Sequence, residues 1–293
     1  NILESGLFFR LDASNVLSKN IASVVTPIGI DHKDFLKKGT VDEIIYEKCS
    51  HLLNDSKIII AEQKSGILPK IKKNIYKNSS TKIFFGKNYM YKKNTNGFTY
   101  EDKIGKIKLP QPSLLGDFQF SNISTAISVV RNLEKFKISE NHIKKALTKI
   151  RSEGRLQFIK HGKLRKYVSS NNQILIDGAH NPLAASVIKK YLESFGKKRE
   201  IIMVLGMMAN KEHKKFINVL KNNIKSIITV DIPNQENFIK KEDLSKIALS
   251  CGVLSKSENS VRSALKRIKK ENKNAVILVT GSLYFVGEIL NLN

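Results

Sequence analysis

The sequence contains no tryptophan, only two cysteines, and no apolar run near the roughly 20 residues that a membrane-spanning helix requires. Its short apolar runs, such as 58–61 and 275–279, have the length of buried strands. Cys49 and Cys251 are too few for a disulfide framework, and we expect both to be small buried hydrophobes in a reducing compartment. We therefore expect a cytoplasmic protein with no membrane partner.

Acidic residues are also scarce, because 26 Asp and Glu stand against 51 Lys and Arg, a formal net charge of +25. Such an excess is typical of proteins that bind nucleic acid, a membrane surface or an anionic substrate. The lysines, however, are spread among isoleucine and asparagine, as in 70–77 and 266–273, without zinc-finger spacing or an aromatic–basic RNA motif. This pattern favours solvated helix faces over a dedicated nucleic-acid groove, and we expect no nucleic-acid partner.

Short β-branched runs alternate with longer amphipathic stretches, which is typical of an α/β fold with a largely parallel sheet. In the first half, the strand candidates are 2–3, 22–27, 57–61 and 82–85, and the helix candidates are 41–53, 66–77, 118–133 and 140–150. An Asn-Gly turn signal within 90–109 predicts an antiparallel excursion. The pattern restarts with strands 173–176, 200–205, 226–230 and 275–280 and with helices that begin near Pro182, Lys211, Lys240 and Ser260. We predict two α/β domains, 1–150 and 151–293, with a cleft between them.

The most specific motif is the segment 174–182, Ile-Leu-Ile-Asp-Gly-Ala-His-Asn-Pro. An apolar strand ends in Asp177, a glycine permits a tight turn, and Pro182 begins a helix, which is where α/β folds bind ligands. Asp177 could accept hydrogen bonds from ribose hydroxyls, and His180 would lie over the cleft. On these residues alone, the alternative is equally supported: Asp177 caps the helix and His180 packs.

A second group of polar residues follows other predicted elements: Glu4 after the first strand, His32 after the second, and Glu47 and Lys48 in a helix. Since the carboxyl ends of parallel strands meet at one edge, a carboxylate and an imidazole there could share a hard cation such as Mg²⁺. Each residue alone also fits an ordinary role, because a histidine after a strand is more often structural and a Glu-Lys pair is usually a solvated helix face.

Three further residues are less specific. Asn122 lies near the start of a helix with small neighbours, which would let a flat ring approach, although capping or surface polarity is the preferred explanation. Arg155 follows Gly154 at the domain boundary and could bind a phosphate, although linker arginines are common. Ser282 follows the last strand, where amides and hydroxyl could bind a carboxylate, and plain helix capping is slightly favoured.

Taken in order, these segments resemble the folylpolyglutamate synthase and dihydrofolate synthase family of the Mur ligase superfamily, over essentially the whole chain. Residues 4–15, ESGLFFRLDASN, look like the family's Glu-Val-Gly-Leu-Gly-Gly-Arg-Leu-Asp-Ala-Thr-Asn, and residues 26–32, TPIGIDH, look like its Thr-x-Ile-x-x-Asp-His. The other matching segments are 47–48, 115–122, 154–156, 177–182, 205–207 and 281–283. Each match is weak, but the ordered set is specific.

The resemblance implies that 1–150 is a central ATPase domain, truncated at its N-terminus, and that 151–293 is a smaller Rossmann-like C-terminal ligase domain. It implies a monomer whose substrates are ATP, L-glutamate and folate or dihydropteroate, with Mg²⁺ as metal. ATP would phosphorylate the acceptor carboxylate, and the glutamate amine would attack the acyl phosphate. By this resemblance, Glu4 and His32 would bind the metal, and a carbamylated Lys48 and His180 would take part in catalysis. Asn122 would bind the adenine, Asp177 the ribose and Arg155 the phosphates. His180 and Ser282 would bind the glutamate.

Two departures from the family pattern stand out. No G-x-x-x-x-G-K-[ST] phosphate loop occurs in the chain, and the sequence starts at Asn1 in what reads as a strand. We therefore expect a longer protein of which this is an inactive fragment, and an inactive paralogue is the less favoured alternative. Phe8 and Phe9 replace two glycines, which puts the local backbone path in question. The alternatives are another Mur-type amino-acid ligase, or a non-catalytic basic binding protein with the same fold.

Overall fold

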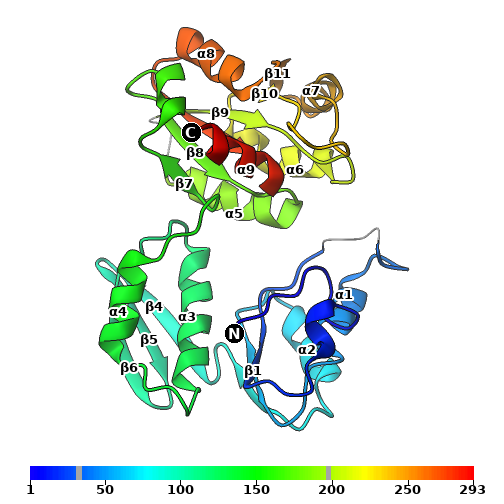
Figure 1. Ribbon diagram of the computed structural model, residues 1–293, viewed down its shortest axis with the longest axis vertical. Coiled ribbons are helices and arrows are strands. Elements are labelled where there is room, and N and C mark those ends of the chain that lie inside the picture. Colours follow the sequence, from blue (N-terminus) through cyan, green and yellow to red (C-terminus); the bar gives the residue numbers. More distant parts are fainter. Residues whose placement is uncertain (31–34, 196–198) are drawn as a thin grey trace. The chain divides into compact units, whose positions relative to one another are not determined.

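The computed structural model describes residues 1–30, 35–195 and 199–293, and these form two compact units (Figure 1). Unit 1 comprises Asn1–Ser113 and Asp117–Ile150, and unit 2 comprises Leu114–Gly116 and Arg151–Asn293. Each unit contains parallel strands that are connected through helices, so the predicted α/β fold class is confirmed.

The first part of unit 1 is a parallel sheet with the strand order β1-β2-β3. Its strands are β1 (Ala22–Val25), β2 (Lys57–Ile60) and β3 (Thr81–Phe84), and its helices are η1 (Ala13–Val16), α1 (Val41–Cys49) and α2 (Ile67–Asn74). The central strand β2 is almost entirely isoleucine, and Ile58, Ile59 and Ile60 are fully buried. A parallel strand that is covered on both faces has to be apolar throughout, and this explains why the segment was recognisable from its composition.

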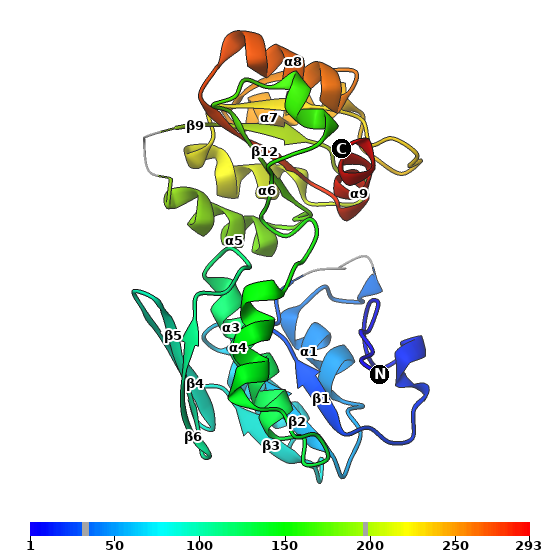
Figure 2. The same cartoon turned by 60° about the vertical axis from the view of Figure 1, so that its left-hand side comes forward.

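The second part of unit 1 is an antiparallel meander of β4 (Tyr89–Asn94), β5 (Gly97–Asp102) and β6 (Gly105–Pro110), with α3 (Phe118–Arg131) and α4 (Glu140–Lys149) beside it (Figure 2). The excursion predicted at 90–109 is thus confirmed, with three strands. Tyr89, Phe98 and Tyr100 are almost fully buried between this sheet and α3. Helix α3 contacts β4 and β5 as well as β2 of the parallel sheet, so it joins the two parts of the unit.

Unit 2 is a six-stranded sheet with the order β11-β10-β9-β12-β8-β7, parallel except for β7 at one edge. Its strands are β7 (Gln157–Ile159), β8 (Gln173–Asp177), β9 (Glu200–Leu205), β10 (Ser226–Thr229), β11 (Leu254–Ser257) and β12 (Ala275–Thr280). Its helices are η3 (Lys163–Tyr167), α5 (Pro182–Glu193), α6 (His213–Leu220), η5 (Lys221–Asn223), α7 (Lys241–Ser250), α8 (Val261–Glu271) and α9 (Leu283–Leu292). Helices α8 and α9 pack their apolar residues on one face of the sheet.

The N-terminal segment differs from the prediction, because residues 1–5 form no strand. Ile2 is fully exposed and Leu3 is 58% exposed, so these apolar side chains have no sheet to pack against among the described residues. The predicted strand at 2–3, and with it the placement of Glu4 at a strand end, is therefore wrong.

Candidate active site

Three neighbouring strands of unit 2 end at the same level, and each is followed by a glycine. Thr280 of β12 pairs in register with Asp177 of β8 and with Leu205 of β9. Gly281 has φ +116, and a Cβ atom there would lie 2.4 Å from the carbonyl oxygen of Gly206. A side chain cannot occupy that space, so the glycines let the three chains leave the sheet close together. The result is a compact strand edge where α/β folds place ligands.

Asp177 at this edge is only 6% exposed, and both of its carboxylate oxygens accept backbone hydrogen bonds. Oδ2 accepts from the Leu156 amide and Oδ1 from the Ala179 amide, each at 2.8 Å. Leu156 has φ +46, a left-handed conformation that costs a residue with a side chain about 1 kcal/mol or more. Asp177 therefore holds the start of unit 2 onto the β8 turn.

The protonation of Asp177 reflects this environment. Burial raises its pKa, although the two amide hydrogen bonds and the nearby charges of Arg155 and His180 act in the opposite direction. The alternative that Asp177 caps the following helix is wrong. Asn181 caps α5 instead, and its Oδ1 accepts from the Ala184 amide at 2.8 Å.

Arg155 lies across the glycine that follows β8. A Cβ atom at Gly178 would be 3.1 Å from the Nη1 atom of Arg155 and 2.2 Å from the Cδ2 atom of Leu283. The Arg155 side chain is exposed, so the guanidinium can still bind an anion from solution. The structure thus brings Arg155 and Asp177 together, as neighbours at one strand edge.

His180 completes this edge of unit 2. Its Nδ1 atom lies 3.0 Å from the Gly178 carbonyl oxygen, and because a carbonyl can only accept, Nδ1 carries a hydrogen atom. This bond orients the ring from its own turn, and the side chain is half-buried. The alternative that His180 packs into the core does not describe this geometry.

Ser282 follows Gly281 at the start of α9 and is 2% exposed. It occupies the N-cap position with extended backbone, yet its hydroxyl makes no capping hydrogen bond. The preferred explanation, helix capping by Ser282, is therefore wrong. Ser282 and the amino end of α9 follow β12 directly, at the strand edge that Thr280 and Asp177 share, where an anionic group would be favoured.

In unit 1, the Lys48 side chain on α1 contacts the segment before η1. Its Nζ donates to the Leu7 carbonyl oxygen at 3.2 Å and lies 5.8 Å from the centre of the Phe8 ring. The adjacent Glu47 accepts two hydrogen bonds from the Arg10 guanidinium, both at 2.9 Å. Both Glu47 and Lys48 therefore make tertiary contacts with the segment before η1, and the alternative of a freely solvated helix face is wrong.

Of the two predicted metal ligands, the structure describes only Glu4, so the predicted pair stays a prediction. Glu4 is exposed, and His32 lies outside the described residues. Across residues 1–30, 35–195 and 199–293, no group of three or more His, Cys, Asp or Glu is placed to hold a metal ion. Asn122 is exposed in the second turn of α3, with its Nδ2 3.3 Å from Gln119 Oε1, so it does not cap that helix.

Phe8 and Phe9, which replace the family's two glycines, fit the fold without strain. Neither has a positive φ. Phe8 is 8% exposed and packs in the core of the β1–β3 sheet, and Phe9 packs against the same core. Large side chains here fill apolar space, so the doubt that the sequence raised about the backbone path does not apply.

Some features were not predicted from the sequence. The repeated glycine after three strands was visible as a pattern, but the contact of Leu156 with Asp177 spans 21 residues and has no local signal. A cavity of about 460 Å³ in unit 1, lined among others by Asn20, Lys57 and Thr81, lies at the amino ends of β2 and β3 and contains none of the predicted site residues.

None of the helices in the described part of the chain is long and apolar enough to cross a membrane.

The comparisons with known proteins cover both units. A family model described as the C-terminal domain of dihydrofolate synthetase matches residues 157–292. A dihydrofolate synthase/folylpolyglutamate synthase of Buchnera aphidicola subsp. Acyrthosiphon pisum is 29% identical over 296 residues, which cover 99% of this chain and 66% of the relative. Over nearly its whole length, this chain is similar to members of the dihydrofolate synthase/folylpolyglutamate synthase family. The resemblance found in the sequence is thus confirmed.

Solved structures of the family have the same fold. Escherichia coli FolC in complex with DHPP and ADP superposes with a TM-score of 0.81 at 23% identity, over 98% of this chain and 64% of that chain. The bifunctional enzyme of Yersinia pestis, complexed with AMPPNP and a Mn ion, gives 0.82 at 19% identity, over 98% and 64%. The predicted Mur-ligase-type fold is confirmed. The chain spans 64–66% of the length of these family members.

Proposed function

We propose that this chain is part of an ATP-dependent ligase that joins L-glutamate to the carboxylate of folate or dihydropteroate, acting in the cytoplasm. In this proposal unit 1 is the remainder of the central ATPase domain and unit 2 is the C-terminal ligase domain. The observation that carries it is the match of 99% of the chain to a dihydrofolate synthase/folylpolyglutamate synthase, together with the strand edge of Arg155, Asp177 and His180. The structure of Escherichia coli FolC in complex with DHPP and ADP, which has the same fold, supports this proposal.

The proposed reaction has two steps that balance. A carboxylate oxygen of the acceptor attacks the γ-phosphorus of ATP, which forms an acyl phosphate and releases ADP. The glutamate amine then attacks the acyl carbon, the carbon–oxygen bond to phosphate breaks, and the amine loses a proton as the amide and inorganic phosphate form. Both steps depend chiefly on positioning the reactants and neutralising anionic charge.

In unit 2 we assign these tasks to the residues of the strand edge. The exposed guanidinium of Arg155 binds phosphate oxygens as a fork of donors. Asp177 positions Arg155 through the Leu156 amide, and each of its oxygens retains a second lone pair for a ribose hydroxyl. His180, with its ring oriented by the Gly178 carbonyl, and Ser282 at the amino end of α9 bind the incoming glutamate.

In unit 1 we assign Asn122, exposed on α3, to the adenine, and Lys48 to the reaction itself. The proposed carbamylation of Lys48 would replace its cation with a carboxylate beside the Leu7 carbonyl oxygen, to which its Nζ now donates. Phosphoryl transfer in the family would use a divalent metal, as the Mn ion in the Yersinia pestis complex indicates for that protein. Glu4 is exposed and no cluster of metal ligands forms among the described residues, so no step is assigned to a metal here.

Residues 1–293 contain no glycine-rich phosphate loop with Gly-Lys-Ser/Thr. Backbone amides of such a loop hold the ATP phosphates, and Arg155 alone does not replace them. We infer that residues 1–293 by themselves do not turn over ATP at a useful rate.

The test is ADP release by the product of the whole gene, measured with all substrates and with each one left out. We expect ATP consumption only when glutamate and a pteroate or folate acceptor are both present, and none from residues 1–293 alone. Arg155→Gln should lower kcat/KM by about 10²-fold through loss of phosphate contacts. Arg151→Gln, an exposed arginine of the same segment, is the matched control and should leave it unchanged. Turnover with a cell-wall precursor in place of the folate acceptor would instead identify another Mur-type ligase.

A further inference from the structure

Helix α8 of unit 2 has three distinct sides. Its apolar residues Val261, Ala264, Leu265 and Ile268 are buried against the sheet. On a second side, Arg267 is paired with Glu258 and with Glu271, and Glu271 also pairs with Lys256. The third side carries cations only.

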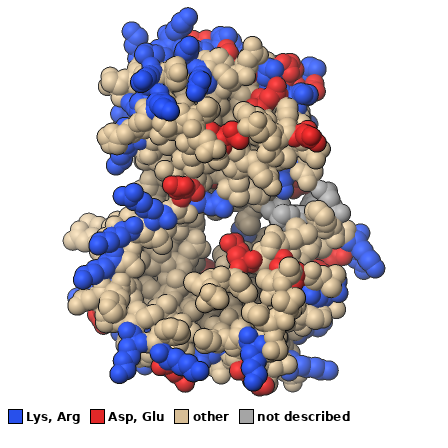
Figure 3. All heavy atoms as spheres, viewed as in Figure 1, with Lys and Arg blue, Asp and Glu red and all other residues tan. Residues whose placement is uncertain are grey.

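This third side consists of Arg262, Lys266, Lys269 and Lys270, which are all exposed. Their spacing of i, i+4, i+7 and i+8 places them on one helix face, over a length of about 12 Å at 1.5 Å per residue. Figure 3 shows lysine and arginine side chains gathered over the region where Figure 1 draws α8. None of the four pairs with a carboxylate among the described residues.

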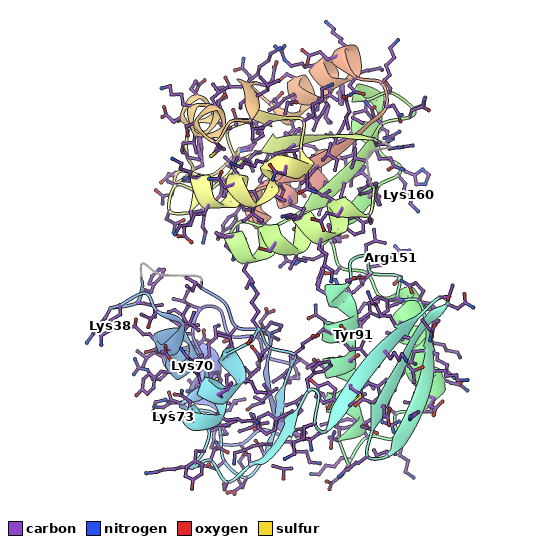
Figure 4. The ribbon with its side chains drawn as sticks, turned by 180° about the vertical axis from the view of Figure 1, so that it is seen from behind. Lys38, Lys70, Lys73, Tyr91, Arg151 and Lys160 are labelled. Carbon is purple, nitrogen blue, oxygen red and sulfur yellow. The ribbon has the colours of Figure 1, made fainter. Side chains whose placement is uncertain are left out.

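The neighbouring turn η3 extends this face. Lys269 Nζ donates to the Lys166 carbonyl oxygen at 3.3 Å, and Lys266 Nζ lies 5.5 Å from the centre of the Tyr167 ring. These contacts bring the exposed Lys166 next to the helix cations. In Figure 4, Lys160 projects outward from the segment just before η3. We name Arg262, Lys266, Lys269, Lys270 and Lys166 the basic stripe.

Most of the basic stripe lies toward the amino ends of the strands, away from the strand edge described above. Helix α8 runs from the end of β11 back to the start of β12, so its last turn lies toward the amino ends of the strands. Turn η3 likewise precedes β8, whose carboxyl end carries Asp177. Lys166, Lys266, Lys269 and Lys270 therefore do not belong to the proposed ligase site.

Contrary to the expectation from the sequence that nucleic acid is no partner, we propose that the basic stripe binds the phosphodiester backbone of nucleic acid without sequence specificity. Five exposed cations, none of them paired with a carboxylate in the described part of the chain, lie within a few turns and match a chain of evenly spaced phosphates. A membrane fits less well, because helices that lie in the interface insert apolar residues, and the apolar residues of α8 are buried in the protein core. The bias of the whole sequence toward lysine explains a high net charge, but not why one side of α8 lacks the carboxylates that the other side has.

The test uses a fluorescein-labelled oligothymidylate and its anisotropy, titrated with the chain at several salt concentrations. Single-strand binding through five phosphate contacts predicts a slope of log K against log salt of about −3.5, so about 100-fold weaker binding between 50 and 200 mM salt. The variant K166E/K266E/K269E should lower the slope by about 2 in magnitude and weaken binding at least tenfold at low salt.

The matched control is K137E/K145E/K149E, which reverses three exposed lysines of unit 1 and changes the net charge equally. It should weaken binding no more than about twofold. K166Q/K266Q/K269Q, which removes the charges without adding new ones, is the second variant should the reversal disturb folding, as checked by circular dichroism melting.

Equal losses in the stripe and control variants would show that total charge, not the stripe, attracts the oligonucleotide, and would overturn the proposal. Binding to vesicles that contain phosphatidylserine, lost in the stripe variant while the oligonucleotide does not bind, would also overturn it in favour of a membrane surface.

Discussion

Replacement of Asp177 by alanine should loosen the start of unit 2 where it meets the β8 turn. The carboxylate accepts from the Leu156 and Ala179 amides, both at 2.8 Å, and is 6% exposed. Hydrogen bonds to a charged group contribute about 1.5–3 kcal/mol each, which gives about 3–6 kcal/mol for the two. Burial of this charge is itself unfavourable, as the raised pKa of Asp177 indicates, so the alanine variant regains part of that free energy. We expect a net loss of about 2–3 kcal/mol.

The assay is denaturant unfolding of unit 2 combined with hydrogen exchange at the two amides. In Asp177→Ala, the Leu156 and Ala179 amides should exchange faster, and the unfolding midpoint should fall. Asp243→Ala is the control, because Asp243 is an exposed carboxylate of unit 2 that pairs with Lys246, and it should cost less than about 1 kcal/mol. If both amides stay protected and the midpoint moves no more than in the control, Asp177 does not hold this turn.

The pH dependence gives the same experiment a second readout. The pKa of Asp177 is raised in the folded state by burial, so the folded chain holds this proton more tightly than the unfolded chain does. Its contribution to stability is therefore greatest at low pH and declines as pH rises from the usual value of 3.8 through the folded pKa. This part of the stability profile should be absent in Asp177→Ala, and an unchanged profile would contradict the assignment.

Three further predictions concern unit 1. Arg131→Met should lower the free energy of unfolding of unit 1 by about 2–4 kcal/mol, measured by denaturant unfolding. The substitution leaves the Asp102 carboxylate, whose side chain is 5% exposed, without its bidentate partner. A loss below about 1 kcal/mol would contradict this prediction. Cys49 should resist a thiol reagent at pH 8 until the chain unfolds, since burial raises the pKa of its thiol to about 12, and rapid labelling of the native chain would count against it. Hydrogen bonds from Ser14 lower the pKa of Asp12 to about 2. The Gly6 amide, which donates to Asp12, should therefore lose protection from hydrogen exchange as pH falls from about 4 toward 2. Asp12→Asn should produce the same loss of protection at neutral pH.

The sequence predicted those parts of the fold whose signal is local. Strand β2 and strand β12 are continuous apolar runs, and Pro182 starts α5 with Asn181 as its cap. The edge strands β7 and β11 were not predicted. Strand β7 has only three residues, and strand β11 is a half-exposed Leu-Ser-Lys-Ser run, so neither shows a clear pattern of buried residues. Edge strands need fewer buried residues, so composition indicates them weakly.

The candidate site shows the same limit. Arg155 and Asp177 were singled out from motifs, and their proximity is a property of the turn after β8. What Asp177 binds could not be predicted, since its partner Leu156 comes from a distant segment in an unusual backbone conformation. Ser282 was expected to cap α9 because serine usually does so, and the structure shows that this hydroxyl makes no such bond.

We propose that this chain is part of a ligase that activates an acceptor carboxylate as an acyl phosphate. The most direct measurement is oxygen-18 transfer, with the label in the carboxylate of the pteroate or folate acceptor and mass spectrometry of the phosphate released by the product of the whole gene. The proposal predicts one labelled oxygen in each phosphate formed, together with a glutamylated product. Glutamylation with unlabelled phosphate would contradict the acyl-phosphate step, and the absence of glutamylation would contradict the ligase itself.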